Sequence, residues 1–163
     1  MSQALHHPEN YVLKDEHGTV RVSFKLDGEP QAQGSKRGFR NPKTGAIIIT
    51  EASAKTKPWR QEIVDLIRHY DLGVGFIGPV QVGLDFYLQH PKAHYRTGRN
   101  AHLLKANAPD YVSVKPDADK LARSVLDALT IGGVFRDDSQ VAVLTVQKRY
   151  AESPGVRVTV SRL

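Results

Sequence analysis

Apolar and polar residues alternate along three stretches of this chain, and a period of two is typical of a strand with one buried face. The three stretches are residues 19–26, 80–88 and 156–161. Two further strands are expected at residues 46–50 and from residue 141 to about residue 150. Because Ser153-Pro154-Gly155 is a turn sequence, we expect the last two strands to form a hairpin.

Two other stretches carry apolar residues at helical spacing. Residues 58–70 predict an amphipathic helix with proline tolerated in its first turn, and the apolar positions are Trp59, Ile63, Leu66, Ile67 and Tyr70. A second helix is expected to begin near residue 117, because an apolar stripe follows that consists of Leu121, Ala122, Val125, Leu126 and Leu129. Pro116 disfavours helical backbone at Lys115, so the chain should be extended just before this helix.

Three segments show no usable periodicity. Residues 1–18 are expected to be a flexible tail, and residues 30–45, which are rich in Gly, Pro, Lys and Arg, a loop. Residues 89–112 form a longer irregular segment, and a loop of that length inside a compact domain is usually functional or disordered. The order of the elements predicts a small α+β fold in a single domain, residues 19–163.

The composition indicates one soluble domain with a hydrophobic core, since 40% of the 163 residues are hydrophobic and 25% are charged. No apolar run approaches the roughly 18 residues of a membrane span, and the first residues do not resemble a secretory signal. The absence of cysteine excludes disulfides, thiolate zinc sites and cysteine nucleophiles, and it is compatible with a reducing cytoplasm. A net charge of +6 at pH 7 favours polyanionic partners, nucleic acid first.

Residues 115–129, KPDADKLARSVLDAL, gather carboxylates that contrast with this positive charge. Asp117 and Asp119 fall at the expected start of the helix, where carboxylates can cap free backbone N–H groups. Asp119, Arg123 and Asp127 are four residues apart and therefore share one polar ridge of the helix. Taken alone, the pattern also fits a purely structural interpretation, in which Asp117 caps the helix, Asp119 pairs with Arg123, and Asp127 is solvated.

A second acidic pair follows in GGVFRDDSQV, where a tight glycine turn can send the chain back alongside the helix. Asp137 and Asp138 would then return toward the end of the helix that carries Asp117 and Asp119. Clustered carboxylates repel one another unless a cation lies among them. Because the candidate ligands are oxygens and no histidine is near them in the sequence, the pattern favours Mg²⁺ over zinc.

The run KPDADKLARSVLDAL, a short glycine turn and then FRDDSQV resemble the RusA Holliday junction resolvases. The family pattern is roughly P-D-x-D-N-L-x-K, then D-A-L, then D-D-x-Q-V, and the clear match covers about residues 115–148. The upstream GSKRGF…NPKTG, followed by a helix, is weaker support. The resemblance implies a RusA-like α+β domain with a mixed β-sheet and two main helices. It also implies a homodimer that depends on Mg²⁺, for which Mn²⁺ can substitute.

The same resemblance implies roles for the acidic residues. Asp117, Asp119 and Asp138 would be the essential residues and the metal ligands, with Asp137 as an auxiliary carboxylate beside them. The family's catalytic lysine falls at Arg123, which keeps the positive charge but cannot donate a proton at neutral pH.

Basic residues of the irregular segments are expected to contact the DNA backbone. Lys120 stands where the family usually has asparagine, and it could reach a phosphate. The other expected contacts come from Lys36, Arg37, Arg40, Lys92, Arg96, Arg99 and Lys105.

The resemblance therefore predicts a structure-selective endodeoxyribonuclease of a bacterium or phage, which acts in the bacterial cytoplasm in DNA recombination and repair. It would resolve four-way junctions by paired symmetric nicks that leave ligatable 5′-phosphate ends. Symmetric cutting needs two active sites related by a twofold axis and hence a homodimer, but neither a membrane nor a small-molecule cofactor. Two alternatives stay open: a branched-DNA-binding protein that has lost its nuclease activity, and a nucleotide-sugar or nucleotidyl transfer site at the D-x-D.

Overall fold

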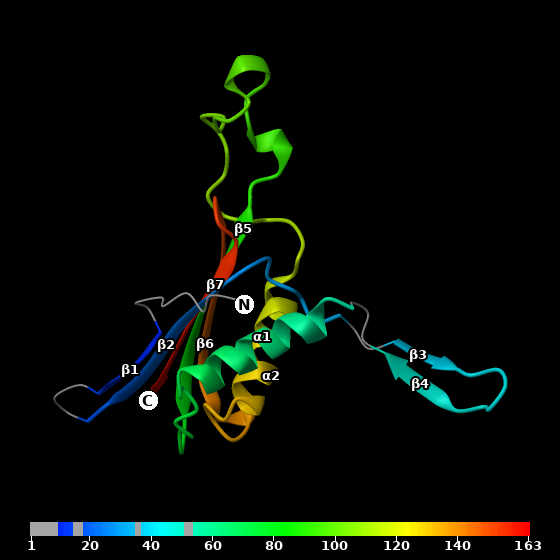
Figure 1. Cartoon of the computed structure of the whole chain (residues 1–163), viewed down its shortest axis with the longest axis vertical. Coiled ribbons are helices and arrows are strands. Elements are labelled where there is room, and N and C mark those ends of the chain that lie inside the picture. The colour runs from blue at the N-terminus through cyan, green and yellow to red at the C-terminus, as the bar shows by residue number, and fades with distance from the viewer. Residues whose placement is uncertain (1–9, 15–17, 35–36, 51–53) are drawn as a thin grey trace.

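The body of the molecule is one mixed sheet of five strands in the order β1-β2-β7-β5-β6 (Figure 1). The computed structural model describes residues 10–14, 18–34, 37–50 and 54–163. The strands of this sheet are β1 (Tyr11–Lys14), β2 (Val20–Asp27), β5 (Val80–Gln89), β6 (Val141–Ala151) and β7 (Gly155–Arg162). β5 and β6 run parallel, whereas the other neighbouring pairs run antiparallel.

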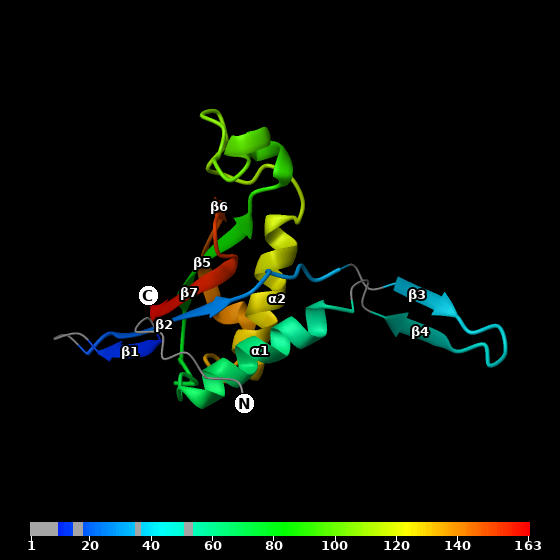
Figure 2. The ribbon, with the colours of Figure 1, turned by 45° about the horizontal axis from the view of Figure 1, so that its top comes forward.

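Two helices, α1 (Thr56–His69) and α2 (Ala118–Ile131), pack against each other and cover one face of the sheet (Figures 1 and 2). Leu121, Val125 and Leu129 are four residues apart, so they share one side of α2, and all three are fully buried. They meet α1 and the inward side chains of the sheet in one core. The predicted single α+β domain, with a mixed sheet and two main helices, is confirmed. Within the described ranges, no helix is both long enough and apolar enough to cross a membrane.

The last two strands do not form the expected hairpin, because β5 lies between β6 and β7. The turn at residues 152–154 carries the chain across the end of β5, and β7 then pairs with β2 on its other side. A Cβ at Gly155 would lie 2.6 Å from the backbone oxygen of Leu26, so glycine permits β7 to start this close to β2. A turn sequence indicates where a chain reverses, but not whether another strand enters between the two arms.

Two segments that were expected to be irregular contain short strands. β1 lies within residues 1–18 and pairs antiparallel with β2. Within residues 30–45, β3 (Arg37–Arg40) pairs with β4 (Ile47–Thr50) to form a two-stranded arm that projects from the body (Figure 1). Neither YVLK nor RGFR alternates strictly between apolar and polar residues, which is the pattern that predicts a half-buried strand. The expectations of a tail through residue 18 and of a loop through residue 45 are therefore wrong at β1 and β3.

A second projection, residues 90–112, extends beyond the end of β5 (Figure 1) and matches the expected long irregular segment. It contains two single-turn 3₁₀ helices, η1 (Lys92–His94) and η2 (Gly98–Asn100). Its two arms are joined where Lys105 Nζ donates to the backbone oxygen of Ala93 at 2.7 Å. The segment is thus folded on itself without joining the main sheet, except at its end near residue 111.

Candidate active site

Asp117 stands at the N-terminal cap of α2, but its side chain binds a lysine rather than the helix backbone. The Asp117 backbone is extended, and its side chain makes no capping hydrogen bond. Lys120 Nζ lies instead 2.7 Å from Asp117 Oδ2. The hydrogen bond from Lys120, followed by the charge of the same lysine, holds the pKa of the Asp117 carboxyl below its usual value. The contact also raises the pKa of Lys120, so both groups are ionised at neutral pH.

Lys148 of β6 fixes the chain that leads into this cap. Its Nζ donates to the backbone oxygens of Val114 and Pro116, each at 2.8 Å. These bonds place the N-terminal end of α2 beside the final residues of β6. Lys148 was not among the predicted site residues, although its position in phase with the apolar Leu144 and Val146 on one face of a strand was an available signal.

Asp119 and Arg123 lie exposed on α2 near the same end. Among the residues that the structure describes, neither side chain makes a hydrogen bond or an ion pair, so the pairing of the two in the purely structural interpretation is not formed. Asp127 is not simply solvated, because Arg60 Nη1 of α1 donates to Asp127 Oδ2 at 3.2 Å. The aspartate of the D-A-L motif thus joins the two helices, whereas Asp119 and Arg123 are left available to a ligand.

The glycine turn after α2 sends the chain toward the start of β5. Gly133 has a φ of 77°, and the N–H groups of Gly133 and Val134 donate to carbonyls of the last helical turn at 3.1 and 3.0 Å. This is the hydrogen-bond pattern of a Schellman C-cap, in which glycine tolerates the left-handed backbone. The backbone N–H of Phe76 then donates to the Val134 oxygen at 2.8 Å. The segment that follows is therefore tied to the chain just before β5.

Asp137 and Asp138 are held in this segment by a capping box around η3 (Asp138–Gln140). The Asp137 side chain accepts from the Ser139 backbone N–H at 2.8 Å, and Gln140 Oε1 accepts from the Asp137 N–H at 3.2 Å. Gln140 Nε2 donates at 2.9 Å to two backbone oxygens within residues 76–78. Hydrogen bonds from Ser139 lower the pKa of Asp137. Within the described ranges, the exposed Asp138 side chain makes no hydrogen bond or ion pair.

The two acidic pairs therefore lie at opposite ends of α2, and the expectation that they converge within one chain is wrong. α2 runs antiparallel to β6, so its N-terminal end lies near Lys148, whereas the chain after its C-terminal end enters β6 at Val141 (Figures 1 and 2). At about 1.5 Å per residue, α2 is about 20 Å long, too long for a shared cation. Among the described residues, no three acidic or histidine side chains are grouped so that they could hold a metal. The sequence predicted that the chain reverses after α2. It did not predict that β6 pairs parallel with β5, and this pairing decides where Asp137 and Asp138 lie.

The basic residues expected to contact DNA lie mainly on the two projections. Arg37 and Arg40 belong to the β3–β4 arm, and Lys36 lies outside the described residues. The segment 90–112 carries Lys92, Arg96, Arg99 and Lys105. α2 begins between the roots of the two projections (Figures 1 and 2), and Asp117, Asp119 and Lys120 belong to the cap and first turn at this end of the helix.

Comparison with known proteins identifies the family of this chain. The family described as Endodeoxyribonuclease RusA matches residues 27–161, which include both acidic pairs, α2 and β6. The chain belongs to the RusA endodeoxyribonuclease family. It is also 32% identical over 143 residues to the uncharacterized protein YqaN of Bacillus subtilis (strain 168), and this similarity covers 85% of the chain and 94% of YqaN.

The RusA match begins at the end of β2, so it also covers a strap of residues 28–33 that crosses from β2 to the helices. Gly28 donates its N–H to the Pro154 oxygen at 3.0 Å, and Gln33 donates its N–H to the Lys120 oxygen at 3.0 Å. Thr56 Oγ1 donates to the Ala32 oxygen at 2.9 Å. The strap therefore fixes the first turn of α2, which carries the candidate site, to α1 and to the β6–β7 turn.

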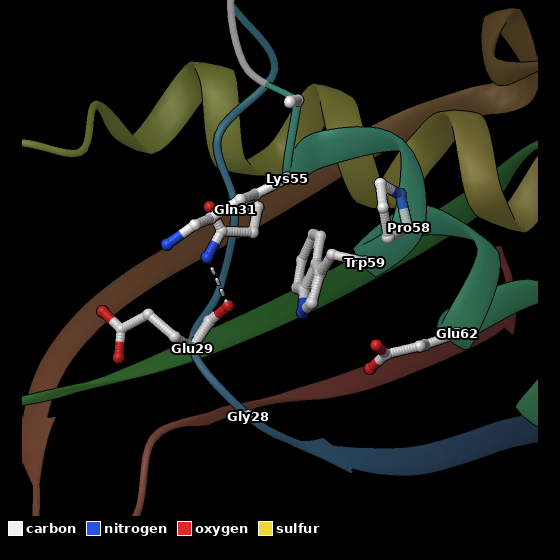
Figure 3. A pocket seen from close by; sticks show the side chains of 8 residues that line it. Gly28, Glu29, Gln31, Lys55, Pro58, Trp59 and Glu62 are labelled. Atoms are coloured by element: carbon white, nitrogen blue, oxygen red, sulfur yellow. Dashed lines mark hydrogen bonds between the residues drawn. The ribbon is translucent and has the colours of Figure 1, made fainter.

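A surface pocket of about 390 Å³ lies between this strap and the first turns of α1 (Figure 3). The Trp59 side chain forms its floor, and Glu29 and Glu62 lie on either side of the indole (Figure 3). Gln31 Nε2 donates to the Glu29 backbone oxygen at 3.0 Å. None of the residues that line the pocket is a predicted site residue, so the pocket is separate from the candidate active site.

Proposed function

We propose that this chain is a Mg²⁺-dependent, structure-selective endodeoxyribonuclease that resolves four-way DNA junctions by paired nicks. Its membership in the RusA family supports a nuclease that acts on DNA. The exposed Asp119 and the half-exposed Asp117, next to a lysine and between two basic projections, support a site for a phosphodiester and a cation. The position of the acidic pairs at opposite ends of α2 supports the more specific proposal that each active site needs two chains.

In this proposal each site combines Asp117 and Asp119 of one protomer with Asp138 of its partner. Among the residues that the structure describes, too few carboxylates gather at either end of α2 to surround a cation. A twofold axis that sets the N-terminal end of α2 beside the C-terminal end of the partner's α2 would form two equivalent sites. Three carboxylates without histidine or cysteine are a donor set that suits Mg²⁺ and also Mn²⁺. Two sites are also what paired nicking of a symmetric junction requires.

The side chains near the site have different tasks in this reaction. When bound, Mg²⁺ would supply Lewis acidity for hydrolysis of the phosphodiester. Asp117, Asp119 and the partner's Asp138 would hold it, with Asp137 beside them. A water molecule would attack the phosphorus as the P–O3′ bond breaks. The water would lose a proton to solvent and the departing 3′ oxygen would take one up, so that one cut end carries a 5′-phosphate and the other a 3′-hydroxyl.

Arg123 fits a role in binding rather than in proton transfer. It lies one turn after Asp119 on the exposed side of α2, and its guanidinium stays charged at every working pH. We assign it to the scissile phosphate, which a planar guanidinium can bind through two N–H groups. The basic residues of the projections would bind the phosphates further along the arms, and their contacts make binding strongly dependent on salt.

The test is cleavage of a labelled four-way junction and of a linear duplex of matching sequence, with Mg²⁺ or with EDTA. We expect paired, ligatable nicks in the junction only, in Mg²⁺ only. Asp119→Asn should lower the cleavage rate at least about 100-fold, since it removes a charged ligand of the cation. It should leave junction affinity nearly unchanged. Asp65→Asn, an exposed substitution on α1, is the matched control and should cleave normally.

Other outcomes favour the alternatives. Tight junction binding without cleavage in either Mg²⁺ or Mn²⁺ would identify a binding protein that keeps the fold without the chemistry. Protection by a nucleotide with metal, without preference for junctions, would favour a transfer reaction at the D-x-D. Cleavage that survives Asp119→Asn would place the active site elsewhere in the chain.

A further inference from the structure

A lysine of β6 lies at the start of α2, beside the candidate active site. Lys148 pairs with the buried Phe86 of β5, so its side chain rises on the face of the sheet that the helices cover. Its Nζ lies 2.8 Å from the backbone oxygens of Val114 and Pro116, and Pro116 directly precedes Asp117. The ammonium group is therefore a close neighbour of the first candidate metal ligand.

Among the described residues, no carboxylate forms an ion pair with Lys148. Its two acceptors are neutral carbonyl oxygens, and within the same ranges no protein group accepts its third N–H. Lys120, in contrast, contacts Asp117 at 2.7 Å, so the charges of that pair largely cancel. Lys148 thus offers a positive charge and a free donor at this end of α2, and a phosphate oxygen binds both.

The Lys148 side chain is held in place before any substrate binds. Its strand, β6, pairs with β5 from Val141 to Ala151. The Lys148 backbone oxygen also accepts from the Val112 N–H at 3.0 Å, so backbone and side chain both bind residues 112–116. A lysine usually loses rotamer freedom when it binds a ligand, but the two carbonyl contacts have already fixed this one. The charge is therefore preorganised.

A preorganised charge is useful in hydrolysis of a phosphodiester, because negative charge builds on the oxygens around the phosphorus. Arg123 is one cation at this end of the molecule, on the exposed side of α2. Lys148 comes from a different element, the strand β6. Two cations that come from different elements can contact different oxygens of one phosphate.

We propose that Lys148 is a further catalytic residue, whose third N–H binds an oxygen of the scissile phosphate next to Asp117. This inference rests on the proposed function, because it requires a phosphodiester at the start of α2. The hydrogen bonds to residues 114 and 116 keep Nζ in position, and its charge stabilises the phosphate while the attacking water and the departing 3′ oxygen share the negative charge. Lys148 keeps all its protons in this role.

The first test is junction binding in EDTA, which removes divalent cations, over a range of salt concentrations. The slope of log affinity against log salt concentration counts the neutralised phosphates, at about 0.9 per phosphate. We expect Lys148→Met to weaken binding several-fold and to lower the magnitude of this slope by about one. Lys14→Met, on the opposite edge strand of the sheet, is the control and should keep the wild-type slope.

The second test is the single-turnover rate of junction cleavage in Mg²⁺. We expect Lys148→Met to lower this rate about 100-fold, the usual effect of removing one group that stabilises charge in a transition state. Lys148→Arg keeps the charge and has enough N–H groups for both carbonyls and a phosphate. It should therefore restore the salt slope and most of the rate. A Lys148→Met chain with a lower melting temperature but the wild-type slope and rate would overturn the proposal, because the lysine would then be purely structural.

Lys148→Gln decides the question if Lys148→Met does not fold. Its amide can still donate to a carbonyl of the segment before α2, but it carries no charge. We expect this variant to fold and to show the same loss of slope and of rate. A folded Lys148→Gln with the wild-type slope and rate would refute the contact with the phosphate.

The two measurements also separate this inference from the proposed function. If the wild type nicks junctions and Lys148→Met does so equally fast with an unchanged slope, the role of Lys148 is refuted and the function is kept. If Lys148→Met loses slope but the wild type never nicks junctions, the contact with the phosphate is kept and the nuclease function is refuted.

Discussion

Asp117 and Lys120 set the charge at the start of α2. Their contact of 2.7 Å leaves one negative charge on Asp119 close to the positive Arg123. The sequence indicated that both aspartates begin the helix, since proline, D-x-D and an apolar stripe are local patterns. It did not indicate that the lysine in the position of the family's asparagine would bind Asp117, because that depends on the rotamers of two exposed side chains.

Replacing Lys120 should change how Asp117 titrates. The pKa of Asp117 lies below its ordinary value of 3.8 mainly because of Lys120, so Lys120→Met should raise it toward that value. A lowered folded pKa stabilises the fold above the ordinary pKa, and the effect is lost as pH falls through the folded pKa. The thermal stabilities of wild type and Lys120→Met should therefore differ at pH 7 and converge in acid, once Asp117 is protonated in the folded state.

Carboxyl NMR titration measures this pKa directly. Lys115→Met is the control, because Lys115 acts on Asp117 through charge alone and more weakly. Identical titration curves for wild type and Lys120→Met would show that the lysine does not bind Asp117 in solution.

α2 shows which parts of an element can be predicted from sequence. Its start, its buried side and its glycine-terminated end follow from neighbouring residues, and the structure agrees with all three. The position of Asp137 and Asp138 depends instead on the parallel pairing of Val141 with Val80. These two residues are far apart in the sequence, so no local pattern predicts that they pair. The expected hairpin of β6 and β7 was wrong for the same reason, because β5, which is distant in the sequence, lies between these two strands.

The two helices are held closely at their C-terminal ends by Gly73 and Gly132. A Cβ at Gly73 would lie 2.6 Å from the Gly132 backbone oxygen, which cannot move without displacing the end of α2. We predict that Gly73→Ala destabilises the fold by about 1–3 kcal/mol. In a chain of this size that lowers the melting temperature by roughly 2–4 °C per kcal/mol, measured by calorimetry.

Gly38→Ala provides the comparison for this prediction. Among the residues that the structure describes, a Cβ at Gly38 meets only the Ile47 side chain, at an ordinary 3.6 Å, so this variant should melt close to the wild type. Equal melting temperatures for both variants would mean that the chain near Gly73 relaxes without cost.

At the scale of the whole molecule, the two acidic pairs lie at opposite ends of α2. The N-terminal end of α2 lies between two basic projections and has two carboxylates, and the other end of α2 has the second pair. The family and the site residues could be proposed from sequence, because the motif is contiguous except for one turn. A homodimer could also be predicted from sequence, but the proposal that each site draws carboxylates from both chains could not, because it depends on the antiparallel arrangement of α2 and β6.

The most direct test of this account is to mix two inactive variants, Asp119→Asn and Asp138→Asn, and measure junction nicking. A mixed dimer has one site with every carboxylate intact, formed by Asp117 and Asp119 of one chain and Asp138 of the other. The account predicts that mixing restores nicking of one strand per junction, whereas mixing Asp119→Asn with Asp117→Asn restores nothing. Mixed dimers that are verified by native mass spectrometry but do not nick would contradict it, because each site would then draw all its carboxylates from one chain.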